Sequence, residues 1–374
     1  MSSLKSEKFK ILVLDGGGIR GVVTAIILQS VQEQVGKPLN QYFDLIAGTS
    51  TGSILAAGIA LGLEPKKLIN IYEKRGQEIF NALWLRKNVM KWFLGSKYSN
   101  KGLIKVLREE LGEVTLRQVG EISKAQLLIL AYDTLYRNTT FFASRCPEEN
   151  RWFNDMKLWE VCLSSASAPT FFPPYEFQWK DPNSSATDEW KFPHVDGGVS
   201  ANCPALAALS YATNVKKINI SDITMLSIGT GATTKPIEYK EMKNWGTLSW
   251  GEHVPDVFMG GQIQIATDLC SEIIQAANPG GYLRLQFLLN ERFGERINPL
   301  SPRPILPLKE QKNKYINKAI NEAMDDTSED NIKNLREAAS KFAKEKSSDI
   351  KKFILDQDPN ALMSPLVAEG ATTY

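Results

Sequence analysis

A serine between two glycines lies near the N-terminus, where an apolar run changes into a helical one. The segment is Gly48-Thr49-Ser50-Thr51-Gly52, preceded by apolar residues 42–47 and followed by small and aliphatic residues 53–61. A sharp strand-to-helix turn of this composition can hold a serine in strained backbone, and its glycines remove side chains that would collide there. The N–H groups that open the helix would favour negative charge on the hydroxyl. The pattern predicts a nucleophile for acyl transfer; the alternative is an ordinary Ser/Thr/Gly loop that caps a buried helix.

A second glycine cluster follows the first apolar run of the chain. Residues 9–14 are predicted to form a buried strand, and Asp15-Gly16-Gly17-Gly18-Ile19-Arg20-Gly21 joins it to a helix that ends at Gly36. Three successive glycines expose backbone N–H groups that suit an oxyanion or a phosphate. A dinucleotide site is disfavoured because the second strand carries Asp44 inside it and has no acidic residue at its end. An NTPase loop is disfavoured because no Gly-Lys-Ser/Thr follows.

A serine nucleophile needs a base, and the chain has only two histidines, His194 and His253. In α/β Ser-His-Asp hydrolases the histidine comes last, so His253 could fill that place with Asp196 as the acid. Alternatively Asp196 itself takes the proton, because burial beside the serine would raise the pKa of its carboxyl group. The glycine pair after Asp196 would let that carboxylate approach another backbone closely. His194 has the same strand parity as Asp196 and could touch it.

Three motifs together resemble the signatures of the patatin-like phospholipases. They are Asp15-Gly16-Gly17-Gly18-Ile19-Arg20-Gly21, Gly48-Thr49-Ser50-Thr51-Gly52 and Asp196-Gly197-Gly198, in this order. Each motif alone is a weak signal, and the three together are a strong one. The likeness continues through residues 164–174, 225–231, 244–246 and 323–326, so that it covers about residues 8–345.

The resemblance implies a catalytic dyad without histidine and without a metal or a cofactor. Ser50 would be the nucleophile and Asp196 the base, and His194 would be a polar neighbour. The oxyanion hole would be formed by the backbone of Gly16, Gly17 and Gly18. Arg20 would support this loop and could meet a lipid headgroup, or it is simply a surface cation. Gly48, Gly52, Gly197 and Gly198 would be the remaining supporting positions.

The arrangement of apolar runs predicts an α/β fold: a three-layer sandwich in which helices flank a mostly parallel central sheet. Further strands are expected at residues 126–132, 139–142 and 223–228. A single domain over residues 8–346 fits the 374-residue chain, because no linker-like run divides the motifs. Residues 328–346 are expected to form a charged amphipathic helix, and residues 347–374 a C-terminal tail.

One stretch has the composition of a membrane-interface segment. Residues 82–95 combine Trp84, Trp92 and Phe93 with three cations, and a Trp-rich loop at 245–258 could complete an apolar rim. The alternative is a buried cap helix. A net charge of +2 gives no reason to expect a nucleic-acid partner. The longest apolar run is far below the roughly 18 residues that span a bilayer.

The sequence therefore predicts a lipid acyl hydrolase of phospholipase A, lysophospholipase or galactolipase type that acts at membrane surfaces. A cytoplasmic location is expected, because residues 1–8 lack the apolar core of a signal peptide and the four cysteines show no paired spacing. The alternatives are a Ser-His-Asp esterase and a non-enzymatic storage or scaffold protein on the same fold. Regulation by a partner or a small second messenger stays open.

Overall fold

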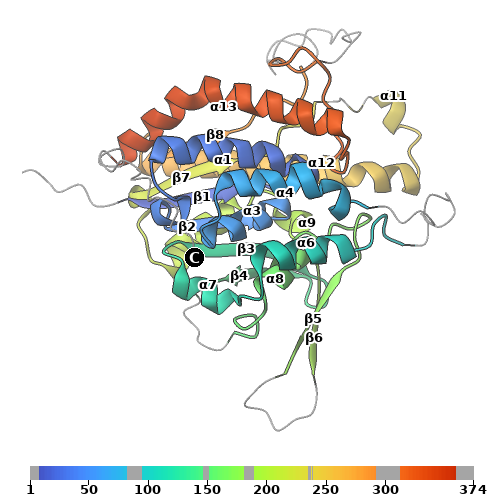
Figure 1. Ribbon diagram of the computed structural model, residues 1–374, viewed down its shortest axis with the longest axis horizontal. Coiled ribbons are helices and arrows are strands. Elements are labelled where there is room, and N and C mark those ends of the chain that lie inside the picture. Colours follow the sequence, from blue (N-terminus) through green and yellow to red (C-terminus); the bar gives the residue numbers. More distant parts are fainter. Residues whose placement is uncertain are drawn as a thin grey trace, which may run out of the picture.

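The computed structural model describes residues 8–81, 95–145, 151–180, 189–234, 237, 239–291 and 312–358. An eight-stranded sheet runs through the molecule in the order β5-β6-β3-β2-β1-β7-β8, and β4 pairs with β3 outside this path (Figure 1). The strands are β1 (Phe9–Leu14), β2 (Leu45–Thr49), β3 (Gln126–Asp133), β4 (Asn138–Ala143), β5 (Tyr175–Trp179), β6 (Trp190–Asp196), β7 (Ile223–Ile228) and β8 (Tyr282–Leu285).

The sheet is parallel at its centre and antiparallel at one end. The pairs β3–β2, β2–β1, β1–β7 and β7–β8 are parallel, whereas β4, β6 and β5 join by antiparallel pairing. The central strands are near-continuous apolar runs because helices cover both of their faces. The β5–β6 hairpin extends away from the rest of the sheet (Figure 1).

Two apolar cores lie on opposite faces of this sheet, as the alternation of strand residues requires. Leu12 and Ile46 belong to one core, and Val13 and Ala47 belong to the other. The first core is covered by α1 (Gly21–Val35), α3 (Thr51–Ala60), α4 (Pro65–Ile79), α6 (Lys101–Leu111), α7 (Leu116–Ile122) and α8 (Leu158–Ser165), and the second by α10 (Ala205–Ser210) and α12 (Thr247–Ala277). The predicted three-layer α/β architecture is confirmed.

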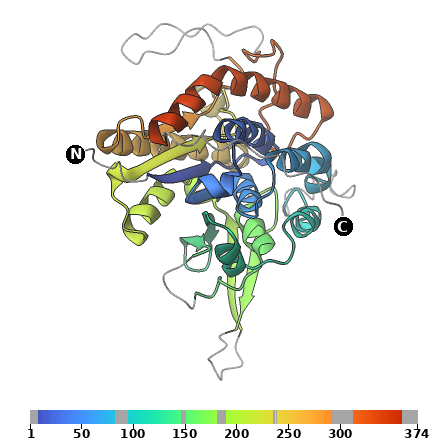
Figure 2. The same ribbon diagram turned by 60° about the vertical axis from the view of Figure 1, so that its left-hand side comes forward.

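The remaining elements are short, except for the last helix. Helix α13 (Glu329–Gln357) lies across α1, and the views in Figures 1 and 2 agree on this placement. The short elements are η1 (Gly18–Arg20), α2 (Leu39–Tyr42), α9 (Gly198–Ala201), η3 (Tyr211–Val215), η4 (Ile220–Asp222) and α11 (Tyr239–Met242).

Three elements differ from the sequence-based expectations. Strand β2 begins only at Leu45, because α2 occupies the preceding residues and the Asp44 carboxylate accepts the amide of Lys10 at 2.8 Å. Residues 247–258 are not a loop but the first turns of α12. Helix α13 continues past residue 346 to Gln357, because Ile350 and Ile354 extend its buried side. The segment with Trp84, Trp92 and Phe93 lies outside the described residues, as does the tail from 359 onward.

Candidate active site

The turn between β2 and α3 holds Ser50 in a backbone conformation that L-residues rarely adopt. Its φ is 54° and its ψ is −127°. A Cβ on Gly48 would lie 2.3 Å from the carbonyl oxygen of Gly52, and one on Gly52 would lie 2.2 Å from that of Leu14. The backbone can therefore turn this sharply only with glycine at both places. Strain of this kind is characteristic of nucleophile turns.

Ser50 and Asp196 lie together because two strands end against neighbouring residues of β3. Thr49, the last residue of β2, pairs with Leu130, and Asp196, the last residue of β6, pairs with Ala131. The Ser50 hydroxyl donates a hydrogen bond of 2.6 Å to Oδ2 of Asp196. The other carboxylate oxygen accepts the amide of Gly198 at 2.7 Å.

The Asp196 carboxyl group is a stronger base than an ordinary aspartate. It is 4% exposed, and this burial raises its pKa to about 7 despite the hydrogen bonds from Ser50 and Gly198, which favour the ionised form. A carboxylate with a pKa near the working pH can take a proton from a hydroxyl and return it. The geometry therefore places a proton acceptor directly on the strained serine.

The C-terminal end of α8 holds both partners in place. Ser165 Oγ accepts the amide of Ser50 at 2.9 Å and donates to the carbonyl oxygen of Leu130 at 2.6 Å. The carbonyl oxygen of Ser167 accepts the amide of Asp196, and that of Ser165 accepts the amide of Gly197. Ser165 and Ser167 were not predicted as site residues, although both lie within residues 164–174, a segment that the sequence already marked as part of the family likeness.

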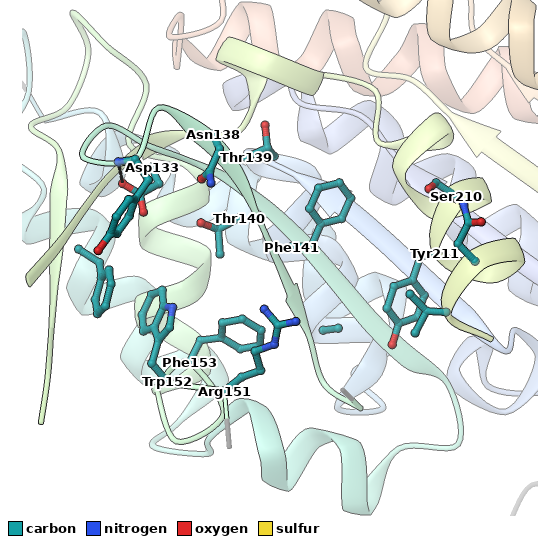
Figure 3. Close-up of a pocket in the computed structure, with 15 residues that line it drawn as sticks. Asp133, Asn138, Thr139, Thr140, Phe141, Arg151, Trp152, Phe153, Ser210 and Tyr211 are labelled. Atoms are coloured by element: carbon teal, nitrogen blue, oxygen red, sulfur yellow. Dashed lines mark hydrogen bonds between the residues drawn. The ribbon is translucent and has the colours of Figure 1, made fainter. Parts of the chain in front are cut away.

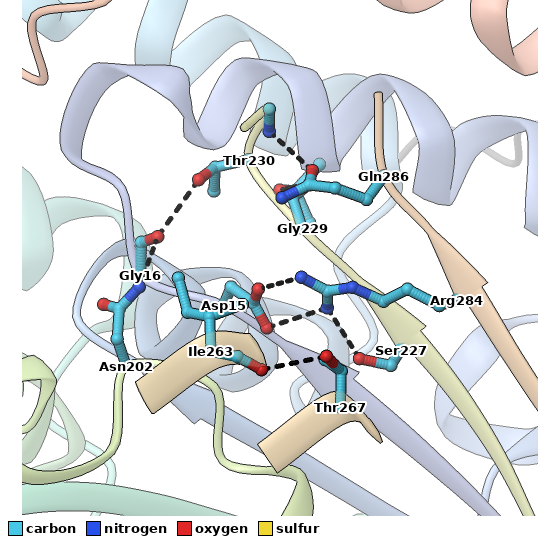
Figure 4. Close-up of polar contacts among 12 residues, drawn as sticks. Asp15, Gly16, Asn202, Ser227, Gly229, Thr230, Ile263, Thr267, Arg284 and Gln286 are labelled. Atoms are coloured by element: carbon cyan, nitrogen blue, oxygen red, sulfur yellow. Dashed lines mark hydrogen bonds and ion pairs between the residues drawn. The ribbon is translucent and has the colours of Figure 1, made fainter. Parts of the chain in front are cut away.

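The glycine loop after β1 lies beside the dyad. Gly17 and Gly18 line the same cavity as Ser50, and their amides find no acceptor among the described residues. The amide of Gly16 instead donates to the carbonyl oxygen of Asn202 at 3.0 Å. Thr230 Oγ1 donates to the Gly16 carbonyl oxygen at 3.0 Å (Figure 4). The expectation that all three glycine amides serve an oxyanion is therefore wrong for Gly16, whose N–H is already bonded.

A buried ion pair anchors the start of this loop. Both terminal nitrogens of Arg284 on β8 contact the carboxylate of Asp15, which is 1% exposed (Figure 4). Arg284 also donates to Ser227 Oγ at 2.7 Å. Because a buried carboxylate is costly without a partner, Arg284 stabilises the loop that precedes the glycines. Nothing in the local sequence of β8 predicts this role.

Arg20 is a supporting residue and not a surface cation. It is 5% exposed, and its guanidinium donates to the carbonyl oxygens of Gly17 at 3.4 Å and Glu322 at 3.2 Å. The amide of Ile19 donates to the carbonyl oxygen of Met324 at 2.8 Å. Residues far along the chain therefore fix the outer side of the glycine loop.

A cavity of about 520 Å³ opens beside the dyad, a size typical of small-molecule sites. Ser50, Asp196 and the glycine loop form its polar end. The remainder is mainly apolar and includes Ile54, Tyr72, Ile79, Phe80, Leu103, Pro169, Phe171, Phe172, Val199, Phe258, Met259 and Met324. Such a cavity fits a long apolar group whose reactive end lies at Ser50.

A second cavity of about 490 Å³ lies along β4 and shares no lining residue with the first (Figure 3). One of its residues, Thr140, bonds His194 Nε2 at 2.8 Å, and His194 Nδ1 lies 3.0 Å from the carbonyl oxygen of Phe192. Burial lowers the pKa of His194, which disfavours the charged ring. Both ring nitrogens of His194 are thus bonded away from Asp196, and the contact with Asp196 that the strand parity would allow is not formed. His253 lies on α12, and its side chain is outside the described part of the structure.

The described residues hold no cluster of His, Cys, Asp and Glu side chains that could bind a metal. Three of the cysteines, Cys162, Cys203 and Cys270, are buried free thiols. Among the described helices none combines the length and the apolar character that crossing a bilayer requires.

Comparison with known proteins places the chain in a family. The family described as patatin-like phospholipase matches residues 12–209. Patatin-T5 of Solanum tuberosum is 31% identical over 313 residues, which are 75% of this chain and 76% of that protein. Patatin-03 of the same plant is 33% identical over 65% of this chain and 67% of its own. The human GIVD cytosolic phospholipase A2 structure matches with a TM-score of 0.48 and 10% identity, over 94% of this chain and 60% of that one. The chain belongs to the patatin-like phospholipase family and is an ester hydrolase of that family.

Proposed function

We propose that this lipid acyl hydrolase cleaves the fatty-acyl esters of membrane glycerolipids through a Ser50–Asp196 dyad. The observation that carries the proposal is the 2.6 Å hydrogen bond from Ser50 Oγ to Asp196 Oδ2 at the polar end of an apolar cavity. The apolar walls would hold the acyl chain, and the ester carbonyl would lie at Ser50. Phospholipids, lysophospholipids and galactolipids all present such an ester.

In the first half-reaction, Ser50 Oγ attacks the ester carbonyl carbon while Asp196 takes the hydroxyl proton. The negative charge that develops on the carbonyl oxygen is stabilised by the amides of Gly17 and Gly18 and by the first turn of α3. The bond to the alcohol oxygen then breaks. Asp196 gives its proton to that oxygen, and the lysolipid leaves an acyl group on Ser50.

In the second half-reaction, a water molecule attacks the acyl-serine carbonyl carbon and Asp196 takes one of its protons. The bond to Ser50 Oγ breaks, the fatty acid is released, and the proton returns to the serine. One carboxyl group with a raised pKa therefore serves as base and acid in turn. No histidine is needed, in agreement with the engagement of both His194 nitrogens elsewhere.

The test combines two variants with a mixed lipid extract as substrate. Ser50→Ala and Asp196→Asn should each lower release of fatty acid by about a thousandfold or more, measured by mass spectrometry of the products. The products of the wild-type protein identify the headgroup class and the acyl position. Appreciable hydrolysis by Ser50→Ala would show that another nucleophile operates, and a wild-type protein without any hydrolysis would favour the storage or scaffold role.

We also propose that the protein works in the cytoplasm and contacts membranes transiently. The free thiols of Cys162, Cys203 and Cys270 suit a reducing compartment. A contact through Trp84, Trp92 and Phe93 follows from their composition alone, since they lie outside the described residues. Fractionation of cells that express the full chain, with and without alanine at these three positions, tests both statements.

A further inference from the structure

The apolar surface of helix α12 is wider than the side of the helix that packs against the rest of the protein. Its inner side faces the sheet through Ala266, Cys270 and Ile274, which recur at every fourth residue and are at most 7% exposed. This spacing places one stripe of the helix against the core formed with α10 and the strands. A helix that only covered this core would carry polar residues on the rest of its surface.

A second apolar stripe lies beside the first and faces solvent. Ile265, Leu269 and Ile273 each precede an inner residue by one position, and Phe258 lies two turns before Ile265. These four side chains, the outer stripe, are 60%, 42%, 39% and 59% exposed in that order. Large apolar side chains gathered on one exposed helix face mark an interaction surface.

The outer stripe is continuous with the mouth of the active-site cavity. Phe258 belongs to the stripe and also lines that cavity, together with its neighbours Met259 and Gln262 on the same helix. Val199, which is 44% exposed, lines the cavity from α9. The outer stripe therefore begins at the cavity with Phe258 and continues along the helix, with Gly261 and Gln262 between Phe258 and Ile265.

We propose that the outer stripe of α12 rests on the surface of a lipid aggregate, with its side chains in the acyl boundary. An acyl chain could then pass from the lipid into the cavity without crossing water. The inference rests on the proposed function and adds to it the surface, the helix and the residues that bring the dyad to its substrate.

The charge of α12 argues for lipid against a second copy of this chain. The helix contains four acidic residues and no lysine or arginine. Asp268 and Glu272 directly precede two residues of the outer stripe, Leu269 and Ile273. Two such helices packed together would therefore bring like charges into contact, and they would also cover the cavity. A zwitterionic lipid surface presents neither obstacle. The same absence of cations means that the contact is apolar and should persist in high salt.

The test uses the full chain with Ser50→Ala, so that the probe is not consumed, and vesicles of phosphatidylcholine. The Ile265→Glu/Leu269→Glu variant removes the centre of the outer stripe. The matched control is Ile122→Glu/Leu135→Glu, which changes side chains that are 65% and 57% exposed on α7 and in the β3–β4 turn. Co-sedimentation should fall about tenfold or more for the stripe variant and stay at the parent level for the control. Raising the salt from about 0.1 M to about 1 M should not release the parent protein.

Three results would overturn the inference. The stripe variant could still bind vesicles, or the parent protein could fail to bind them. The third result is a parent protein that is dimeric in light scattering and a stripe variant that is monomeric. Hydrolysis of a water-soluble short-chain ester by the protein with Ser50 intact separates this inference from the proposed function. Without such hydrolysis the proposed function fails. With it, and with unchanged vesicle binding by the stripe variant, only the docking surface fails.

Discussion

Thr49 and Asp196 meet the same edge of β3 from opposite directions, at the consecutive residues Leu130 and Ala131. Strand β2 runs parallel to β3 and β6 runs antiparallel to it, so that both strands end at this point. Because Ser50 directly follows Thr49, the hydrogen bonds of the sheet set the separation between nucleophile and carboxylate. A dyad built on strand ends is held more precisely than one built on loops.

Activity should rise with pH through the neutral range. Asp196 can take the serine proton only when it is ionised, and burial raises its pKa to about 7. The ionised fraction, and with it kcat/KM on an uncharged ester, should increase about tenfold from pH 6 to pH 8. A pH series with a short-chain ester checks this, and a midpoint near the ordinary pKa of aspartate would exclude Asp196 as the base.

Asp196→Asn should be inactive and yet more stable than the wild type in weak alkali. The pKa of this carboxyl group is higher in the folded state than in the unfolded state, so the folded protein binds more protons between the two values. The free energy of unfolding therefore falls as the pH rises through this interval. The asparagine variant does not titrate and so avoids that loss. Its free energy of unfolding at pH 8, measured with urea, should exceed that of the wild type by about 1 kcal/mol or more. The advantage should shrink towards pH 4; an advantage that does not change with pH would have another cause.

Ser50→Gly should be more stable than Ser50→Ala although both are inactive. The positive φ of 54° strains any residue with a Cβ, and both variants lose the hydroxyl. Thermal unfolding should give a difference of about 1 kcal/mol in favour of glycine. Equal stabilities would mean that the turn relaxes once the hydroxyl is absent.

Replacing one partner of the buried ion pair should destabilise the fold more than replacing both. Asp15→Asn leaves the guanidinium of Arg284 without its counter-charge and should lower the free energy of unfolding by about 3 to 5 kcal/mol. The double variant Asp15→Asn/Arg284→Met should recover part of that loss. A double-mutant cycle in urea measures the coupling, and strictly additive losses would show that the two side chains act independently.

Replacement of either histidine should leave most of the hydrolytic activity in place. His194→Gln keeps a partner for Thr140, so kcat/KM should fall by less than about tenfold, with a stability loss of about 1 to 3 kcal/mol from the buried site. His253→Ala is the companion variant. A loss by either one as large as that of Ser50→Ala would bring back the Ser-His-Asp mechanism.

Local sequence predicted the parts of the site that local backbone chemistry determines. The turn at Ser50 and the loop at Gly17 and Gly18 stand out in the sequence as short glycine motifs, and the central strands are readable as apolar runs. The atoms that a Cβ on Gly17 or Gly18 would meet belong to Thr230 and Met324, which the local sequence does not reveal. The bond from the Gly16 amide to Asn202 was not predictable, because it depends on how a distant segment packs. The same holds for Arg284, which lies in a four-residue strand with no distinguishing pattern.

The helices show how packing overrides local preference. The glycines and the proline in 245–258 have low helix propensity, and this stretch was predicted to be a loop. It is helical as the first part of α12, whose later turns are anchored by Ala266, Cys270 and Ile274. Helix α13 was predicted to end early, because the polar residues 344–349 separate Ile350 and Ile354 from the buried residues that precede them.

The segment that identifies the family is shorter than the segment that completes the fold. The family match ends at residue 209, but β7 covers the open edge of β1, Arg284 compensates the charge of Asp15, and Met324 closes the glycine loop, all from later in the chain. A recombinant fragment that stops at 209 would contain every signature motif and would still have a bare sheet edge and an orphaned carboxylate. Any expression plasmid for a minimal version of this protein should therefore run through Gln357.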